Sequence, residues 1–152
     1  MADLDRNTRW THRKLREVAT LRTGSPAPQD ERYFAGGHYP FVRVQDLGRY
    51  GRTESLTETK DRINDLAVRE LRPAFARTGS LLFPKSGASI NTKSRALLGC
   101  DAYVVSHLAI LEAREEAATP AWLYHWFCSI DLGRLAHTSA LPSLRLSELA
   151  EL

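Results

Sequence analysis

The stretch that decides the fold is GSLLFPKSGASINTKSRALLG, residues 79–99. A short apolar run at residues 81–83 is ended by Pro84, and a second apolar run follows at residues 96–98. Proline lacks the N–H that a sheet ladder needs, and Gly87 lets the backbone turn tightly. The pattern therefore predicts two strands joined by a loop.

The predicted loop is rich in cations and short polar groups and lacks acids. Between Leu71 and Cys100 there are five Lys or Arg residues and no Asp or Glu. Such a segment favours a phosphate backbone as partner, and Ser, Asn and Thr among the cations are suited to base edges. The alternative interpretation is a solvated hairpin whose charges only keep the protein soluble.

Length and charge indicate one domain with a basic zone. The 152 residues, 43% of them hydrophobic, suit a single globular domain over residues 1–152. The net charge is only +3, but residues 43–95 carry eleven basic and six acidic side chains, whereas residues 96–152 carry three and seven. The positive charge is therefore concentrated in the middle of the chain.

Several features predict a cytoplasmic protein. No apolar run approaches the length of a membrane span, and the polar start is not a signal peptide. Cys100 and Cys128 are too few for a disulfide framework, so we expect both to be reduced.

Along the chain, apolar spacing predicts a short helix over residues 10–21 and a strand over residues 39–46. In that strand Phe41, Arg43 and Gln45 would share one face. A helix capped by Thr57 or Thr59 is expected to end before Pro73.

The second half of the chain predicts strands at residues 103–105 and 108–111, interrupted by Ser106 and His107. Thr119-Pro120 is typical of a helix start. The broad buried face expected for this helix consists of Trp122, Leu123, Trp126, Phe127 and Ile130.

A final element begins at Leu141, with Ser147 as its expected cap. We interpret residues 141–152 as the start of a truncated or terminal element. The strands cluster and do not alternate regularly with helices, which predicts an α/β (α+β) domain with a mixed, mainly antiparallel sheet flanked by helices.

Motifs for catalysis or metal binding are weak. No phosphate-binding or dinucleotide-binding glycine pattern occurs. His125-x-x-Cys128 lacks the second close-spaced pair of a structural zinc site. His107 with Ser106 or Asp101 lacks the context of a hydrolytic nucleophile, so we predict no catalytic residue and no metal.

An ordered set of motifs covers nearly the whole chain and resembles one known family. The matching stretches are KLREVATLRTG (14–24), YPFVRVQDL (39–47), GSLLFPKSGAS (79–89), VSHLAI (105–110), PAWLYHW (120–126) and LPSLRLSEL (141–149). Together they resemble the target recognition domain of the DNA specificity (S) subunit of type I restriction-modification systems.

The resemblance implies a non-catalytic DNA-binding module without a cofactor of its own. In that family each S subunit carries two such domains separated by long helices, and each domain reads half of a split DNA site. Methyltransferase subunits bring S-adenosylmethionine, and a separate restriction subunit cuts. This chain has one domain, so three possibilities stay open: a fragment of a longer subunit, a half-length subunit that pairs with itself, or an orphan domain. Further expected partners are a second recognition domain and the restriction subunit.

The residue pattern and the resemblance indicate the same DNA-binding surface. Gln45 is suited to adenine, and Arg49, Arg52 and Arg95 are suited to phosphates. The full predicted set is Arg43, Gln45, Arg49, Arg52, Lys85, Ser86, Ser89, Asn91, Lys93 and Arg95. We expect these side chains to converge on one concave face.

Two other classes of function stay open. One is a small metal-dependent nuclease or hydrolase that uses Asp101, His107 and nearby carboxylates, although the basic loop lacks the acids that hold a hard cation. The other is a protein-interaction module, which requires an exposed apolar face at Trp122 and Trp126.

Overall fold

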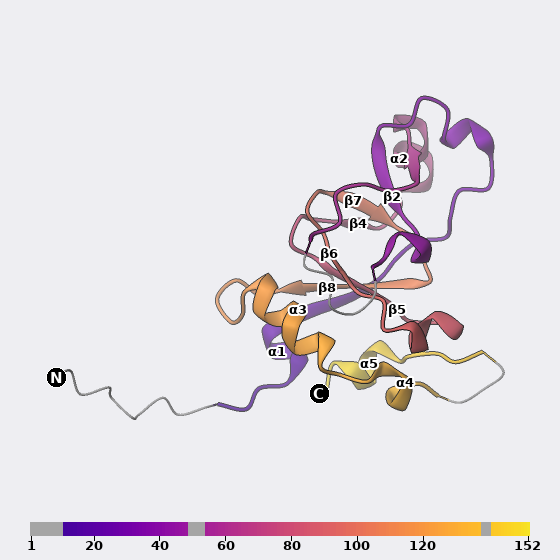
Figure 1. Cartoon of the computed structure of the whole chain (residues 1–152). Coiled ribbons are helices and arrows are strands. Elements are labelled where there is room, and N and C mark those ends of the chain that lie inside the picture. Colours follow the sequence, from indigo (N-terminus) through magenta and orange to yellow (C-terminus); the bar gives the residue numbers. More distant parts are fainter. Residues whose placement is uncertain (1–10, 49–53, 138–140) are drawn as a thin grey trace.

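The computed structural model describes residues 11–48, 54–137 and 141–152, which form two four-stranded sheets (Figure 1). The first sheet has the order β1-β8-β5-β6, with β1 at Ala19–Thr23, β8 at Leu108–Ala113, β5 at Leu81–Pro84 and β6 at Ala96–Leu97. The second has the order β3-β2-β7-β4, with β3 at Asp61–Ile63, β2 at Tyr39–Val42, β7 at Ala102–Val104 and β4 at Phe75–Ala76. Among these strands β2 and β7 pair in parallel and the other pairs are antiparallel. The predicted α+β class is confirmed, with two sheets in place of one.

Short helices cover the sheets or connect their strands. The α-helices of the described ranges are α1 (Leu15–Val18), α2 (Asp65–Leu71), α3 (Pro120–Cys128), α4 (Leu132–Leu135) and α5 (Leu146–Leu149). Three 3-10 turns are η1 (Glu31–Tyr33), η2 (Val44–Asp46) and η3 (Ala88–Thr92). In Figure 1, α1, α3, α4 and α5 lie on one side of the first sheet, and the second sheet and α2 lie on the other. Within these ranges no helix has both the length and the hydropathy that a bilayer crossing needs.

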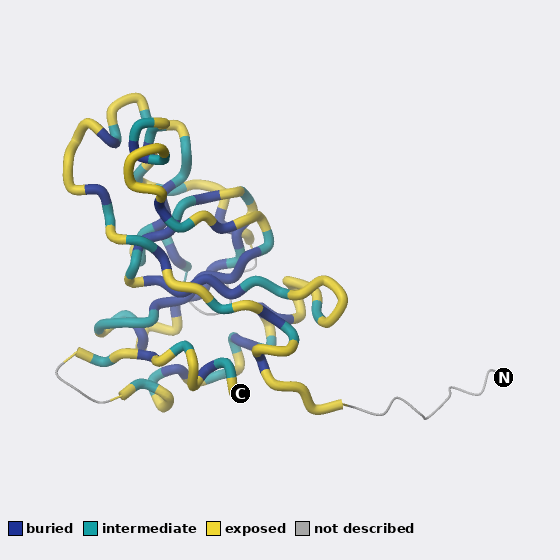
Figure 2. The backbone as a smooth tube through the Cα atoms, turned by 180° about the vertical axis from the view of Figure 1, so that it is seen from behind, coloured by how far each residue is buried: buried dark blue, intermediate teal, exposed yellow. Residues whose placement is uncertain are grey.

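Both apolar cores are built on β5. Leu82 faces the core shared with the second sheet, whereas Leu81 and Phe83 face the core under the helices. Successive strand side chains point to opposite faces, so a strand covered on both sides is apolar throughout. Figure 2 shows this buried layer running through the middle of the molecule. The predicted strand-loop-strand is confirmed, because β5 and β6 pair antiparallel, with Leu81 opposite Leu97.

The start of α3 is also confirmed. The Thr119 side-chain oxygen accepts a hydrogen bond from the Trp122 N–H at 3.3 Å, and Pro120 is the first helical residue. Phe127 of this helix is fully buried, with its ring centroid 4.5 Å from that of Phe83 on β5. This contact fixes α3 against the first sheet.

The expected buried face of α3 is wrong in part. Leu123 and Phe127 are buried, but Trp122 is 54% exposed and Trp126 is only half-buried. Leu123 and Phe127 belong to the core under the helices, whereas Trp122 is not part of it.

Long-range strand pairing replaces the helix expected over residues 10–21. Only α1 is helical, and β1 follows at once and pairs with β8, from Ala19 opposite Ala113 to Thr23 opposite Ala109. Over so few residues the apolar spacing fits both the helical period and the strand period, and the hydrogen-bond ladder with β8 decides between them. Trp10 lies outside the described residues.

Three further element bounds differ from the prediction. The strand over residues 39–46 stops at Val42, since η2 follows it. The helix expected from Thr57 or Thr59 begins later, because β3 occupies residues 61–63 and Asn64 caps α2 with a 3.0 Å bond from the Ala67 N–H. The cap of α5 is Arg145 and not Ser147.

Candidate nucleic-acid interface

Backbone hydrogen bonds hold the acid-free loop between β5 and β6 against two neighbouring segments, so that the loop is braced. The Lys85 N–H donates to the His107 carbonyl at 3.0 Å, and the Lys85 carbonyl accepts from the Leu144 N–H at 2.8 Å. The Gly87 N–H donates to the Pro142 carbonyl at 2.8 Å. Backbone bonds to the β7–β8 turn and to the C-terminal segment therefore hold the loop in one position, which a binding surface requires.

Hydroxyl groups organise the loop from within. Ser89 donates to the Ser86 carbonyl at 3.2 Å, and Thr92 donates to the Ser89 carbonyl at 2.7 Å. Gly87 at φ 81° opens η3 and Lys93 at φ 53° closes it. The left-handed conformation of Lys93 turns the chain back toward β6 and leaves this side chain exposed.

Asn91 lies against a second element. It is exposed, and its side-chain oxygen would be 2.7 Å from a Cβ atom built at Gly133 of α4, so Asn91 lies close to the start of this helix. The nearby Asp131 caps α4 through the Gly133 N–H at 3.0 Å and pairs with Arg134 at 3.6 Å. The loop is thus acid-free in sequence but has one partly neutralised carboxylate close to its tip.

His107 belongs to this site and was not predicted as a DNA contact. Its Nδ1 is 3.1 Å from the Ser86 Oγ, so the β7–β8 turn places an exposed imidazole beside the loop. No ion pair joins His107 to a carboxylate in the described ranges. Only the pairing of β5 with β8, which sets Pro84 opposite Leu108, brings these residues together. The sequence signal was the Ser106-His107 interruption between two strands.

The second predicted segment contacts the same turn. The Val105 N–H donates to the Val42 carbonyl at 3.0 Å, so η2 begins beside the residues that lead to His107. Figure 1 shows η2 and η3 on the same side of the molecule, on either side of the start of β8. Gln45 of η2 is exposed. The structure therefore brings Gln45 and the 85–93 loop to one side of the protein.

Arg43 has partners within the protein. Its Nε donates to the Asp61 carboxylate, and its guanidinium carbon lies 5.4 Å from the centre of the Phe41 ring. Since η2 replaces the expected strand, the predicted shared face of Phe41, Arg43 and Gln45 is wrong. If Arg43 contacts a nucleic acid, its guanidinium would interact with the nucleic acid and with Asp61 at the same time.

Arg95 is turned inward, which contradicts its prediction as a surface phosphate contact. It is 1% exposed, with Nη1 donating to the Ser94 carbonyl at 2.8 Å and the guanidinium 5.5 Å from the Phe127 ring centre. Burial lowers the pKa of this guanidinium, and its Nε makes no hydrogen bond in the described residues. The basic segment of the sequence does not distinguish an inward cation from an outward one.

The remaining predicted cations do not all converge. Arg49 and Arg52 lie outside the described residues. Arg69 and Arg72, which also contribute to the basic middle of the chain, are on and just after α2. That helix is at the far end of the second sheet from η3 (Figure 1). The positive charge is therefore divided, and the braced loop holds one part of it.

Catalytic groups are not assembled from the residues considered for an enzyme. The Asp101 carboxylate accepts hydrogen bonds from the Thr78 N–H at 2.8 Å and its hydroxyl at 3.0 Å, which lower the pKa of Asp101. Asp101 precedes β7 and His107 follows it, so the strand separates them. Among the described residues, no three His, Cys, Asp or Glu side chains gather as metal ligands.

The fold defines a domain class. The S subunit of the type I restriction-modification system of M. genitalium shares it with a TM-score of 0.59 and 16% identity, over 99% of this chain and 35% of that one. A chain from a structure of complex assembly and conformational transition in the type I system shares it with a TM-score of 0.65 and 21% identity, over 99% of this chain and 34% of that one. The HsdS subunit from Thermoanaerobacter tengcongensis shares it with a TM-score of 0.58 and 22% identity, over 97% of this chain and 36% of that one. The chain therefore has the fold of one part of a type I specificity subunit.

The sequence shows a related protein as well. The chain is 31% identical over 104 residues to the type I restriction enzyme MjaIX specificity subunit of Methanocaldococcus jannaschii. This match covers 68% of the chain but only 23% of the relative, and no family model matches. The predicted resemblance is confirmed: the chain is a relative of type I restriction-modification specificity subunits and spans about a quarter of the curated relative it matches.

Proposed function

We propose that this chain binds double-stranded DNA sequence-specifically, as a target recognition module of a type I restriction-modification specificity subunit. It directs a methyltransferase subunit, and with it a restriction subunit, to one half of a DNA site. The chain supplies no catalytic group, and S-adenosylmethionine belongs to the methyltransferase partner. The relationship to specificity subunits supports this role.

The observation that carries the proposal is the braced, acid-free loop at residues 85–93. Lys85 and Lys93 are its cations, and Ser86, Ser89 and Asn91 are its short polar groups. Phosphate contacts set the register of a protein on a duplex, and base contacts supply the specificity. A loop fixed by hydrogen bonds presents both kinds of group without ordering itself at the moment of binding.

Three side chains beside the loop complete the proposed surface. Gln45 is exposed on η2 and can make a bidentate contact with adenine. His107 adds an imidazole next to Ser86, where it offers a hydrogen bond to a base edge or a phosphate. Arg43 is the third, with its charge shared with Asp61.

Selection of bound duplexes from a random library tests the proposal, with the chain alone and with a methyltransferase subunit of a type I system. We expect enrichment of one short half-site, sharpened by the methyltransferase subunit, because one domain alone has a small specificity ratio. A library that stays random in both arms, with no duplex retained at low salt, would refute DNA recognition.

A protein-interaction surface is a second candidate function, and it is compatible with the first. The specific observation is the exposed Trp122 on α3, at 54% exposure. This residue lies in a groove away from the 85–93 loop.

A further inference from the structure

The segment that leads into α5 runs antiparallel along the start of the 85–93 loop. Ser86 forms an antiparallel bridge with Ser143, and the two backbone hydrogen bonds described above, at Lys85 and at Gly87, lie on either side of this bridge. Because the two segments run in opposite directions, following the pairing beyond Gly87 leads to Leu141 on the neighbouring segment, at the level where η3 starts. Leu141 therefore lies beside the loop that carries the proposed DNA contacts.

Leu141 differs from the leucines that follow it. Leu144 and Leu149 are buried in the core under the helices, and Leu146 packs against that core. Leu141 belongs to neither core and is 74% exposed, the highest value among the large hydrophobic side chains of the described residues. A single exposed leucine is common on protein surfaces, so its position beside the loop carries the argument and not its exposure alone.

Two constraints hold the backbone next to this side chain. Leu141 precedes Pro142, and a residue before proline is restricted to extended conformations. The Pro142 carbonyl is in turn fixed by the Gly87 N–H at 2.8 Å. The apolar side chain is thus presented from the same braced framework as the polar groups of the loop, so little ordering is needed on binding.

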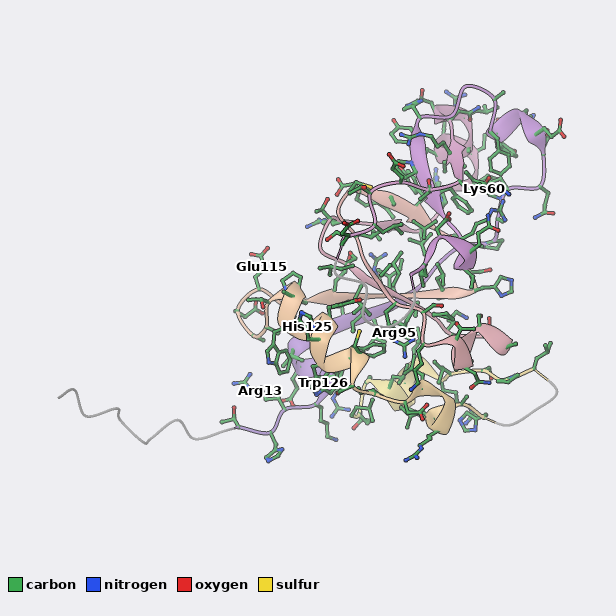
Figure 3. All side chains as sticks on the ribbon, viewed as in Figure 1. Arg13, Lys60, Arg95, Glu115, His125 and Trp126 are labelled. Carbon is green, nitrogen blue, oxygen red and sulfur yellow. The ribbon has the colours of Figure 1, made fainter. Side chains whose placement is uncertain are left out.

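The other large exposed hydrophobic side chains of the described ranges lie elsewhere. They are Leu71 on α2, Phe75 on β4, Trp122 on α3, Leu135 on α4 and Leu152 after α5. Figure 3 shows α3, with Trp126 labelled, across the molecule from η3, and α2 and β4 belong to the side of the second sheet. Leu135 is half as exposed as Leu141, at 36%. Leu141 is therefore the large apolar group that lies at the surface of the loop.

We propose that Leu141 reads a thymine through contact with the C5-methyl group in the major groove. This inference rests on the proposed function and adds an apolar contact to its polar ones. Gln45, Ser86 and His107 supply hydrogen-bonding groups for base edges, but a leucine placed against a phosphate or a polar edge would leave hydrogen bonds of that group unmade. The thymine methyl is the apolar feature that a base pair presents in the major groove, so it is the group from which a leucine gains.

The contact makes two quantitative expectations. Removing the methyl group should weaken binding about fourfold, the effect of withdrawing one buried carbon from an apolar contact. Since Leu141 carries no charge, the dependence of affinity on salt concentration should not change when this side chain is shortened. The selected half-site should therefore contain a thymine whose methyl group contributes through Leu141 and not through charge.

Replacement of thymine by deoxyuridine, which lacks only the C5-methyl group, tests the proposal. The probe is the half-site duplex obtained from the random-library selection, with each thymine of either strand replaced singly, and affinity is measured by fluorescence anisotropy. We expect the wild type to lose about fourfold at one position. Leu141→Ala should bind the thymine duplex at least as weakly as the wild type binds the deoxyuridine duplex, and should not respond to the replacement. Leu141→Met, which keeps an apolar side chain of similar volume, should retain the response.

Two controls separate base reading from a structural role. Leu71→Ala makes the same change at an exposed leucine of the remote α2 and should keep the full response to deoxyuridine. If Leu141→Ala only loosened the loop, it would weaken the thymine and deoxyuridine duplexes equally, whereas a direct contact makes the two changes non-additive. Thermal unfolding of each variant confirms that it is folded.

Four outcomes overturn the proposal while DNA recognition itself stands. They are a selected half-site without thymine, a wild type that loses no affinity with deoxyuridine at any position, a response that survives in Leu141→Ala, and equal weakening of both duplexes by that variant. If no duplex is retained at all, the proposed function fails and the thymine contact fails with it. The two failures are therefore distinguishable.

Discussion

The Ser86 Oγ and the His107 Nδ1 lie 3.1 Å apart and join a loop to a turn 21 residues further along the chain. The Lys85 N–H and the His107 carbonyl add a backbone bond at the same place. This double connection ties the candidate DNA-binding loop to the start of β8, one of the two central strands of the first sheet. The position of the loop thus depends on the rigid core and not on the loop residues alone.

Removing the loop lysines should weaken DNA binding and its salt dependence. If a lysine holds a phosphate, its change to alanine should reduce the slope of log affinity against log salt concentration by about one unit. If it reads a base, Lys85→Ala or Lys93→Ala should instead lower the binding free energy by about 1–3 kcal/mol for duplexes with one particular base pair. Fluorescence anisotropy with several duplexes at a series of salt concentrations distinguishes these cases. Arg114→Ala, which removes an exposed cation at the far end of β8, is the control and should leave the slope unchanged.

The Ser86–His107 contact should act as one unit in DNA binding. Either Ser86→Ala or His107→Phe should lower affinity by roughly 0.5–1.5 kcal/mol, the net value of one hydrogen bond. Because each change also breaks the bond between the two residues, the loss of affinity in the double variant should be smaller than the sum of the two single losses. Full additivity of the two losses in titrations at fixed salt would show that the two residues act independently.

The buried Arg95 should be replaceable by an apolar side chain. Arg95→Met removes a desolvated charge that forms no salt bridge within the described residues and has only a longer-range attraction to Asp131, so the free energy of unfolding should stay equal or rise. Arg95→Ala leaves a cavity beside Phe127 and should lower it by about 2–4 kcal/mol. Urea denaturation measures both changes.

The same variant checks the correction of the predicted interface. Since Arg95 does not reach the surface, Arg95→Met should keep the wild-type salt dependence of DNA binding. A salt slope reduced as much as in Lys85→Ala would mean that Arg95 leaves the core when DNA binds.

Because of Asp101, the free energy of unfolding should decrease as the pH is lowered in the acid range. Hydrogen bonds from the Thr78 N–H and hydroxyl lower the pKa of Asp101 in the folded state below its value of about 3.9 in the unfolded chain. The stabilisation is therefore present above about pH 4 and is lost as pH falls through the folded-state pKa. Asp101→Asn should be less stable than the wild type at pH 7, and the difference should shrink toward pH 3.

Unfolding curves at pH 7, 5, 4 and 3 measure this effect. Glu58→Gln, which changes an exposed carboxylate without a hydrogen bond to any described residue, is the control and should unfold like the wild type at each pH. A gap between wild type and Asp101→Asn that stays constant from pH 7 to pH 3 would contradict the assignment.

Local sequence predicts the elements that carry their own signals. Pro84 marks the end of β5, and the Thr119-Pro120 pair marks the start of α3, because a missing N–H and a side-chain cap act within a few residues. The basic loop and the resemblance to specificity subunits are equally readable from the chain. Where a signal fits two structures, as in residues 10–21, the prediction fails because a ladder with the distant β8 decides.

The sequence by itself determined the composition of the 85–93 loop, the strands on either side of it and the family relationship. Only the tertiary structure decided that Arg95 turns inward, that Trp122 faces outward and that His107 reaches Ser86. The physical reason is that the environment of a side chain depends on what covers its face of the element. Strands and helices far away in the sequence provide that cover, so no local pattern contains it.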